Sequence, residues 1–299
     1  MPMKLMTGAA LAAAALAGAT PAEAQSFPNL VTSFYDGEFR AHPIAATSIG
    51  VHDYDAEVDD LSRDGQAKDT ARLHTALDAL TAINPATLSA GDRDDREILI
   101  NSIKGTLLDV ETIRYWQKDP DVYVRSATSA VFSLVHRDFA PLADRLRSVI
   151  ARVRQIPILL ATGKANIEHP PRAFVDIAIR NVAGSINFLK IGTPATFAAV
   201  EDQELKREFT ASNDSAIAAF ENYKTYLEQE LKPKADGDFA LGSELFAQRI
   251  AYNEMIDIPP DRLLDIAYAQ LHKDQAALSE AARRSQNGPV RLKSARYVC

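Results

Sequence analysis

Histidine and carboxylate side chains are the groups in this chain that could bind a metal or activate water. The six histidines are His42, His52, His74, His136, His169 and His272. Two histidines four residues apart on one helix face, with a glutamate after the first, can bind zinc and activate a metal-bound water. No histidine here begins a His-Glu-x-x-His motif, and the segment from His272 to Ala276 lacks both the glutamate and the second histidine. We therefore predict that this chain contains no metal ligands, no cofactor ligands and no catalytic residues. His136 and His272 have no partner at helical spacing and are predicted to be surface or hydrogen-bonded histidines.

Acidic residues alternate along residues 53–59, a pattern that also opens calcium-binding loops. The sixth position of such a loop would be Val58 instead of glycine, and the twelfth would be Asp64 instead of glutamate. An acidic surface turn is therefore favoured over a calcium site. Because loops often carry function, Tyr54 and Asp55 are candidates for residues that line a cleft and touch a ligand.

Trp116 is the only tryptophan and precedes the turn at Asp119-Pro120. It is a third candidate cleft residue, since an aromatic ring can stack on a peptide; the alternative is a core anchor at the end of a helix. Sequence motifs for nucleophilic catalysis and for phosphate binding are missing. The sequence has no Gly-x-Ser-x-Gly elbow and no glycine-rich phosphate loop, and its single cysteine, Cys299, is the last residue, so no internal disulfide can form.

Apolar residues recur at helical spacing along most of the chain, which predicts a mainly α fold: an antiparallel multi-helix array of about seven or eight helices. The clearest apolar face runs from Leu142 to Leu160, and Pro157 within it is expected to kink a single helix. Four arginines alternate with the apolar positions of this region, and we predict that they lie on a solvated helix face: Arg145, Arg147, Arg152 and Arg154. Other helical faces run through Leu73–Leu80, Leu99–Val110, Ile217–Leu231 and Leu264–Leu278, and the segment Phe239–Gly242 could add a short extended piece.

Residues 1–24 have the pattern of a cleaved secretory signal. A single positive charge at Lys4 precedes the apolar stretch Leu5–Ala19, and Ala22-Glu23-Ala24 fits the small-x-small cleavage rule. A membrane anchor is less favoured, because about fifteen weakly apolar residues fall short of the roughly 20 that span a bilayer. We predict a secreted protein of the bacterial periplasm. The net charge of −7 argues against nucleic acid or a membrane surface as partner and leaves a peptide or protein.

Several short segments resemble a known bacterial family. The stretch from His42 to Asp55, with the sequence HPIAATSIGVHDYD, is followed by Asp59-Asp-Leu-Ser62 and resembles the opening signature of the family called domain of unknown function 885. Later segments match in the same order, namely Tyr115–Tyr123, Arg145–Leu160, Asn166–Phe174 and Phe239–Gly242 leading into Asp261–Leu264.

The resemblance implies a helical fold related to the zinc peptidases that carry His-Glu-x-x-His, with that motif in the second half of longer chains. This chain resembles only the amino-terminal part, so zinc is expected only in the full-length family. Two functions stay open. The chain is either the non-catalytic part of a secreted metallopeptidase-like protein, forming one wall of a substrate cleft, or a non-enzymatic periplasmic helical module that binds a peptide or a partner protein.

The end of the chain loses the resemblance. Residues 25–283 are predicted to form one helical domain, whereas residues 284–299 turn basic, lose their periodicity and are predicted to be a disordered tail. A truncated or frameshifted reading frame would explain this, and a genuine short paralogue is the alternative. If half of a two-part fold is absent, apolar faces stay exposed, which predicts marginal stability or self-association through the helices between Phe239 and Arg283.

Overall fold

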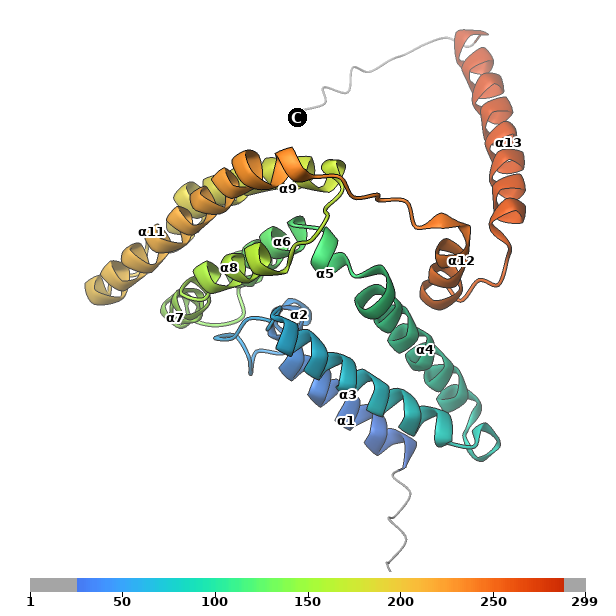
Figure 1. The fold of residues 1–299 in the computed structure, drawn as a ribbon, viewed down its shortest axis with the longest axis horizontal. Helices are drawn as coiled ribbons and strands as arrows, with labels where there is room; N and C mark the ends of the chain where they lie inside the picture. The colour runs from blue at the N-terminus through green and yellow to red at the C-terminus, as the bar shows by residue number, and fades with distance from the viewer. Residues whose placement is uncertain (1–25, 288–299) are drawn as a thin grey trace, which may run out of the picture.

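The computed structural model describes residues 26–287, and these residues are built almost entirely of helices (Figure 1). Within this range no β-strand forms, and Pro171 and Gly237 make an isolated bridge. The predicted mainly α, multi-helix architecture is confirmed. The predicted signal, residues 1–24, and residues 288–299 of the predicted tail lie outside the described part of the chain.

The first group of helices surrounds a small core. It comprises α1 (Phe27–Ala41), α2 (Pro43–Ile49), α3 (Arg63–Ala82), a short 3₁₀ turn (Pro85–Thr87) and α4 (Ala90–Leu107), which continues as a π-helical segment (Leu108–Ile113). Helices α1 and α4 both pack on α3 through buried apolar residues that include Leu30, Leu73 and Ile103. The hydroxyls of Ser62 and Ser89 cap the first turns of α3 and α4, because each accepts a hydrogen bond from a backbone N–H three residues on.

The second group forms the main core. Its elements are α5 (Tyr115–Lys118), α6 (Asp121–His136), α7 (Leu142–Val153), α8 (Ile156–Asn166), α9 (Arg172–Asn187), a π-helical segment (Phe188–Gly192), α10 (Thr193–Thr196), α11 (Gln203–Tyr226), a second π-helical segment (Leu227–Leu231) and a 3₁₀ turn (Lys232–Lys234). Helices α6, α7, α8, α9 and α11 pack around fully buried residues such as Tyr123, Leu134, Val153 and Phe220. The two groups together are called the body, residues 27–234.

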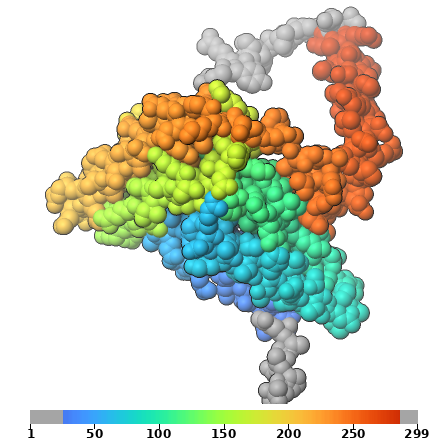
Figure 2. All heavy atoms as spheres, viewed as in Figure 1, coloured from blue at the N-terminus to red at the C-terminus, as the bar shows by residue number. Residues whose placement is uncertain are grey.

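The last two helices bury none of the side chains that the structure describes up to residue 285. They are α12 (Gly242–Asn253) and α13 (Pro260–Asn287), and together they are called the arm. Helix α12 packs on α4, whereas α13 contacts α12 and projects away from the body (Figures 1 and 2). The arm is thus attached at one end only.

Two predictions about helix boundaries were wrong. Leu142–Leu160 is not one kinked helix, because α7 ends at Val153 and Pro157 occupies the first turn of α8, where its missing N–H costs no hydrogen bond. The described residues also form more helices than the predicted seven or eight. Helices α2, α5 and α10 are only four to seven residues long, too short to show a helical repeat. Residues 239–241 lead into α12 without forming a strand.

The predicted solvated arginine face is also wrong in part. Arg147 and Arg154 are exposed as expected, but Arg145 is 5% exposed and Arg152 is completely buried. The reason is that backbone carbonyl oxygens from neighbouring helices accept hydrogen bonds from both buried guanidinium groups.

No helix within residues 26–287 combines the length and the apolar character that crossing a bilayer requires.

Candidate functional site

Residues 42–62 form a short helix and a loop that closes back on α3. Helix α2 ends at Gly50, whose φ of 99° is a left-handed conformation that glycine adopts without strain. The loop then reaches Asp60. A Cβ atom added at Gly65, in the first turn of α3, would lie 2.2 Å from the Asp60 carbonyl oxygen. A side chain at Gly65 would push the loop away, so glycine allows the loop to lie directly against α3.

A pocket of about 400 Å³ opens between this loop and the helices α1 and α3. That volume lies in the lower part of the range for small-molecule sites, ~300–1,000 Å³. Charged side chains dominate its lining, namely Arg40, His42, Glu57, Asp59, Asp60, Lys68, Asp69 and Arg72, and Ala41, Val58 and Leu61 add apolar surface. The pocket therefore combines charged groups with a largely apolar lining surface, which suits a molecule that has both charged and apolar parts.

His42 lies among three carboxylates. Its Nε2 is 3.2 Å from Asp69 Oδ2 and 3.7 Å from Glu38 Oε1, and its Nδ1 is 3.7 Å from Asp59 Oδ2. Burial lowers the pKa of His42, but its interactions with Asp59, Asp69 and Glu38 outweigh burial and raise the pKa to about 10. His42 is therefore a cation at neutral pH, which suits an ion-pair partner and not a general base.

Arg72 completes this cluster. Its Nη2 lies 2.6 Å from a Glu38 oxygen and 2.7 Å from Asp69 Oδ1, and its guanidinium lies over the Phe34 ring. Burial raises the pKa of Asp69, but its interactions with His42 and Arg72 prevail, so the pKa is lowered. With two cations facing three carboxylates, the cluster carries one net negative charge. It ties the end of α1 to α3 and fixes the floor of the pocket.

The rim of the pocket carries charged side chains that take no part in the ion cluster. Arg40 on α1 and Lys68 on α3 are exposed, and neither forms an ion pair with another described residue. Glu57 on the loop is likewise exposed. The free cations thus come from the helices and the free carboxylate from the loop. A molecule with a negative group and a positive group could contact both walls.

Arg152 holds the loop segment to the main core. Its Nη1 donates to the Ala130 carbonyl at 2.9 Å, and its Nη2 donates to the Pro43 carbonyl at 3.0 Å, to Thr47 Oγ1 at 2.6 Å and to the Tyr54 carbonyl at 3.3 Å. Burial lowers the pKa of Arg152, and nearby carboxylates oppose that shift. One buried side chain on α7 therefore positions α2 and the loop that follows it.

Asp55 and Tyr54 lie next to Arg152. Asp55 is buried, and its carboxylate accepts a hydrogen bond from Thr47 Oγ1 at 2.6 Å and contacts His52 Nδ1 at 2.9 Å. Tyr54 is half-buried and offers its carbonyl to Arg152. The lining of the pocket around His42 includes neither residue. Their contact with a ligand stays a prediction, whereas their geometry assigns them a part in holding the loop.

Trp116 lies apart from the pocket around His42. It is half-buried, its Nε1 donates to the Val110 carbonyl at 3.0 Å, and the Arg63 guanidinium lies 5.5 Å from the ring centroid. With His74, these residues line a shallow depression between α3 and α5. Trp116 is thus neither a fully buried core anchor nor a neighbour of the His42 pocket, and its contact with a ligand stays a prediction.

The arrangement of the donor side chains decides whether the described residues could bind a metal. Among residues 26–287, His, Cys, Asp and Glu nowhere gather in a set of three that could hold an ion. The alternating acids diverge, because Asp55 turns inward and Asp59 accepts from the Ile44 N–H at 3.1 Å. The carboxylates around His42 already share two cations. Zinc or calcium therefore does not fit the residues present.

Sequence reasoning missed Glu38, Asp69 and Arg72 of the ion cluster and misassigned Arg152. A usable signal existed for Asp69 and Arg72, since a spacing of three residues places them on one helix face. Nothing in the sequence pattern links that face to Glu38 or His42, which lie 34 and 27 residues from their partners. Alternation with apolar residues predicts a solvated face for Arg152, whereas the structure buries it.

Comparison with known proteins gives a family and a fold. The family described as "Bacterial protein of unknown function (DUF885)" matches residues 43–295. No curated protein matches the chain. A solved structure of "a putative lipoprotein of unknown function" from Shewanella oneidensis is similar, with a TM-score of 0.76 and 22% sequence identity. The similarity covers 88% of this chain and 48% of that one, so this chain spans about half of its length.

Proposed function

The chain belongs to the DUF885 family of bacterial proteins of unknown function, and from this premise we propose that it supplies the non-catalytic, amino-terminal part of a secreted zinc-peptidase-like protein. In this proposal the pocket around His42 is part of the wall of a peptide-binding cleft, and zinc ligands come from residues outside this chain. The fold similarity to a protein of about twice the length supports a two-part architecture.

The observation that carries the proposal is the distribution of charge around the pocket. Arg40 and Lys68 provide unpaired cations on the helical walls, and Glu57 provides a carboxylate on the loop wall. A peptide terminus offers a carboxylate beside polar backbone groups, which the cations can bind by charge-assisted hydrogen bonds. The ion cluster beneath the rim ties α1, α3 and the loop to one another, so the pocket is preorganised.

The binding part of this proposal is tested by isothermal titration calorimetry with trialanine as the probe. Trialanine with a free carboxylate should bind, whereas its C-terminal amide should bind at least ~10-fold more weakly, because a hydrogen-bonded charge pair contributes about 1.5–3 kcal/mol. The double variant Arg40→Ala/Lys68→Ala should lose the preference for the free carboxylate.

The matched control is Arg207→Ala, which removes an exposed arginine on α11 outside the pocket. It should bind trialanine as the wild-type chain does. Equal affinity for the free acid and the amide, or unchanged binding by the double variant, would contradict the assignment of the pocket.

The second candidate is a non-enzymatic periplasmic module that binds a peptide or a partner protein. It is favoured by the same pocket, since binding there uses fixed charges and needs no metal. The two candidates are separated by adding the zinc-motif half of a longer family member to this chain. Zinc-dependent peptidase activity that requires both polypeptides supports the first, and trialanine binding without activity supports the second.

Secretion to the periplasm is part of both candidates and rests on residues 1–24. Fusing these residues to a reporter enzyme and fractionating the bacterial cells tests it. A processed reporter in the periplasmic fraction is expected, and a reporter that stays in the cytoplasm would contradict it.

A further inference from the structure

The shallow depression beside Trp116 is a second concave surface of the body. Its volume is about 600 Å³, within the range of small-molecule sites, ~300–1,000 Å³. One wall is a face of α3, and the other is made by the π-helical segment after α4 and by α5. It shares Gln66 alone with the pocket around His42. The depression is therefore a separate candidate site.

Gln117 on α5 is a buried polar residue whose side chain lacks a partner. The residue is 9% exposed and lines the depression, and its amide forms no hydrogen bond with another described residue. Its backbone is held on both sides, since its N–H donates to the Arg114 carbonyl at 2.9 Å and its carbonyl accepts from the Glu168 N–H at 2.7 Å. Buried polar side chains in folded proteins nearly always have a partner. The partner of this amide has to come from the depression, as water or as a bound molecule.

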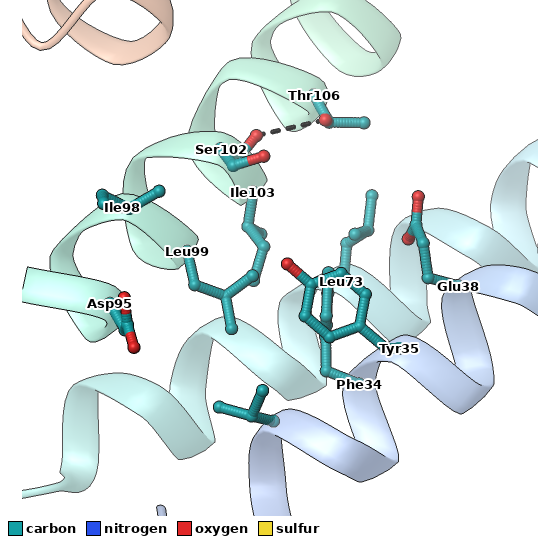
Figure 3. Close-up of a pocket in the computed structure, with 11 residues that line it drawn as sticks. Phe34, Tyr35, Glu38, Leu73, Asp95, Ile98, Leu99, Ser102, Ile103 and Thr106 are labelled. Atoms are coloured by element: carbon teal, nitrogen blue, oxygen red, sulfur yellow. Dashed lines mark hydrogen bonds between the residues drawn. The ribbon is translucent and has the colours of Figure 1, made fainter. Parts of the chain in front are cut away.

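Thr70 on α3 lines the same depression with a free hydroxyl. Threonines in helices commonly donate to a carbonyl of the preceding turn. Thr75 of the same helix donates to the Ala71 carbonyl at 2.9 Å, and Figure 3 shows Thr106 of α4, which donates to the Ser102 carbonyl at 3.1 Å. Thr70 makes no such bond and has no other partner among the described residues. Its hydroxyl is thus available to a ligand.

Arg114 supplies a cation at this site. It has a φ of 58°, a left-handed conformation that is strained for a residue with a side chain and that turns the chain into α5. Its Nε donates to the Glu111 carbonyl at 2.9 Å, and its two Nη groups have no partner among the described residues. The other charges of the lining are paired, because Arg63 pairs with Glu168 and His74 pairs with Glu111.

The unpartnered groups define the chemistry of a ligand. A carboxamide and a hydroxyl can each both donate and accept, as the hydroxyl groups of a sugar do. A free guanidinium binds a carboxylate through two parallel hydrogen bonds. Glu111 is the only acid of the lining and is already paired, so a positively charged group would find no free carboxylate. The groups together fit a monoanion with several neutral hydroxyl groups.

We propose that the depression binds a sugar acid, whose carboxylate pairs with Arg114 and whose hydroxyl groups bond to Gln117 and Thr70. Arg114 and Gln117 are the two ends of one hydrogen-bonded turn, which places their Cα atoms within about 7 Å of each other. Thr70 lies on the opposite wall. One monosaccharide can therefore contact both walls. This proposal does not depend on peptide binding around His42.

The test is a titration of the full chain with sodium D-glucuronate, followed by the fluorescence of Trp116, the only tryptophan. Trp116 lines the depression, and the Arg63 guanidinium lies 5.5 Å from its ring centroid, so a bound anion should change its emission. D-glucose lacks the carboxylate and cyclohexanecarboxylate lacks the hydroxyl groups, so each should bind at least ~10-fold more weakly. The methyl glycoside of glucuronate identifies the source, since a sugar acid at the end of a polysaccharide binds with its anomeric oxygen blocked and a free acid does not.

Matched variants locate the binding groups. Arg114→Gln should weaken glucuronate binding at least ~10-fold and leave glucose unaffected, whereas Arg207→Gln, an exposed arginine on α11, should bind as the wild-type chain does. Thr70→Val should weaken glucuronate binding about 3–10-fold, and Thr75→Val, whose hydroxyl is bonded within α3, should not.

Gln117→Met separates a binding role from a structural one. It removes the amide at nearly constant shape and should weaken glucuronate binding about 3–10-fold. A urea titration should show no loss of stability, because the amide has no partner within the described chain. Lowered stability with unchanged binding, equal affinity for glucuronate and cyclohexanecarboxylate, or calorimetric binding that leaves the Trp116 emission unchanged would overturn the proposal.

Discussion

The body and the arm are made of the same kind of amphipathic helix but differ in what covers their apolar faces. In the body, α6, α7, α8, α9 and α11 bury leucine, valine and aromatic side chains completely. In the arm, no side chain of α12, and none of α13 up to residue 285, is buried. Hydrophobic periodicity therefore predicts that a segment is helical and which side is apolar, but it does not identify the partner of that side.

The body and the arm also differ in the surroundings of their polar contacts. The body contains charges with defined partners, such as the buried Arg152 with Thr47 and the half-buried ion cluster around His42. The arm is attached by polar contacts at its base, where Arg249 donates to Tyr115 Oη at 3.0 Å and lies 3.5 Å from Asp109 Oδ1. Polar contacts over a buried core make a unit that unfolds cooperatively. The arm joins α4 through these polar contacts and half-buried side chains of α12, without a buried core of its own.

The largest expected effect is on the body. Arg152→Met removes the side chain that bonds three segments and leaves Asp55 buried without its cation. The free energy of unfolding should fall by about 3–5 kcal/mol in a urea titration. Arg147→Met, an exposed arginine on the same helix, should change it by less than about 0.5 kcal/mol. Equal effects of the two variants would mean that burial of the arginine does not matter.

The second-largest change in stability is expected where the body is most closely packed. A Cβ added at Gly163 would lie 2.7 Å from Tyr123 Cγ and 2.9 Å from Tyr223 Oη, both in the core. Gly163→Ala should cost about 1–3 kcal/mol through overpacking. Gly184→Ala, in α9 with nothing within 4 Å, should stabilise by about 0.5–1 kcal/mol through helix propensity. The two variants should change the free energy of unfolding in opposite directions. Stabilisation by both alanines would refute tight packing at Gly163.

The ion cluster around His42 predicts a dependence on pH. The pKa of His42 is about 10 in the folded chain and 6.5 as the ordinary value, so its contribution to stability is complete below pH 6.5 and is lost as the pH rises through 10. Urea titrations between pH 7 and 10.5 should show the wild-type chain losing stability more steeply than His42→Gln. The variant should be less stable by about 1–3 kcal/mol at pH 7. Parallel pH profiles of the wild-type chain and His42→Gln would mean that the charge on His42 does not contribute to the stability of the folded chain.

The smallest effect is expected in the arm. Arg249→Gln removes the contacts with Asp109 and with the Tyr115 ring at 5.3 Å. The body should keep its unfolding free energy within about 0.5 kcal/mol, while limited proteolysis between residues 254 and 259 speeds up, since such contacts contribute about 0.5–1 kcal/mol. The control Arg262→Gln removes only a surface pair with Asp265 and should leave the cleavage rate unchanged. A lowered body stability in Arg249→Gln would mean that arm and body form one cooperative unit.

Much of the fold could be predicted from the sequence because long helices show their repeat. The faces at Leu73–Leu80, Leu99–Val110 and Leu264–Leu278 all lie in helices. The division at Pro157 was missed because proline within an apolar repeat suits either a kink or a helix start, and only the neighbouring turn decides between them.

The pocket could be predicted only in part. The signature that begins at His42 marked the right segment, but two of the carboxylates that raise the pKa of His42 come from outside it, Glu38 from α1 and Asp69 from α3. Tertiary ion pairs leave no periodic trace in a sequence. Arg152 was misassigned for the same reason, since its hydrogen-bond acceptors are backbone carbonyl oxygens of distant segments, which every sequence contains.

Hydrogen exchange of the intact chain tests the central claim most directly, namely that the body is held by a buried core and the arm is not. Amides of α6 and α11 should exchange only on global unfolding, whereas amides of α13 should exchange much faster, because its described side chains are not buried. Protection of α13 as strong as that of α6 would contradict the account.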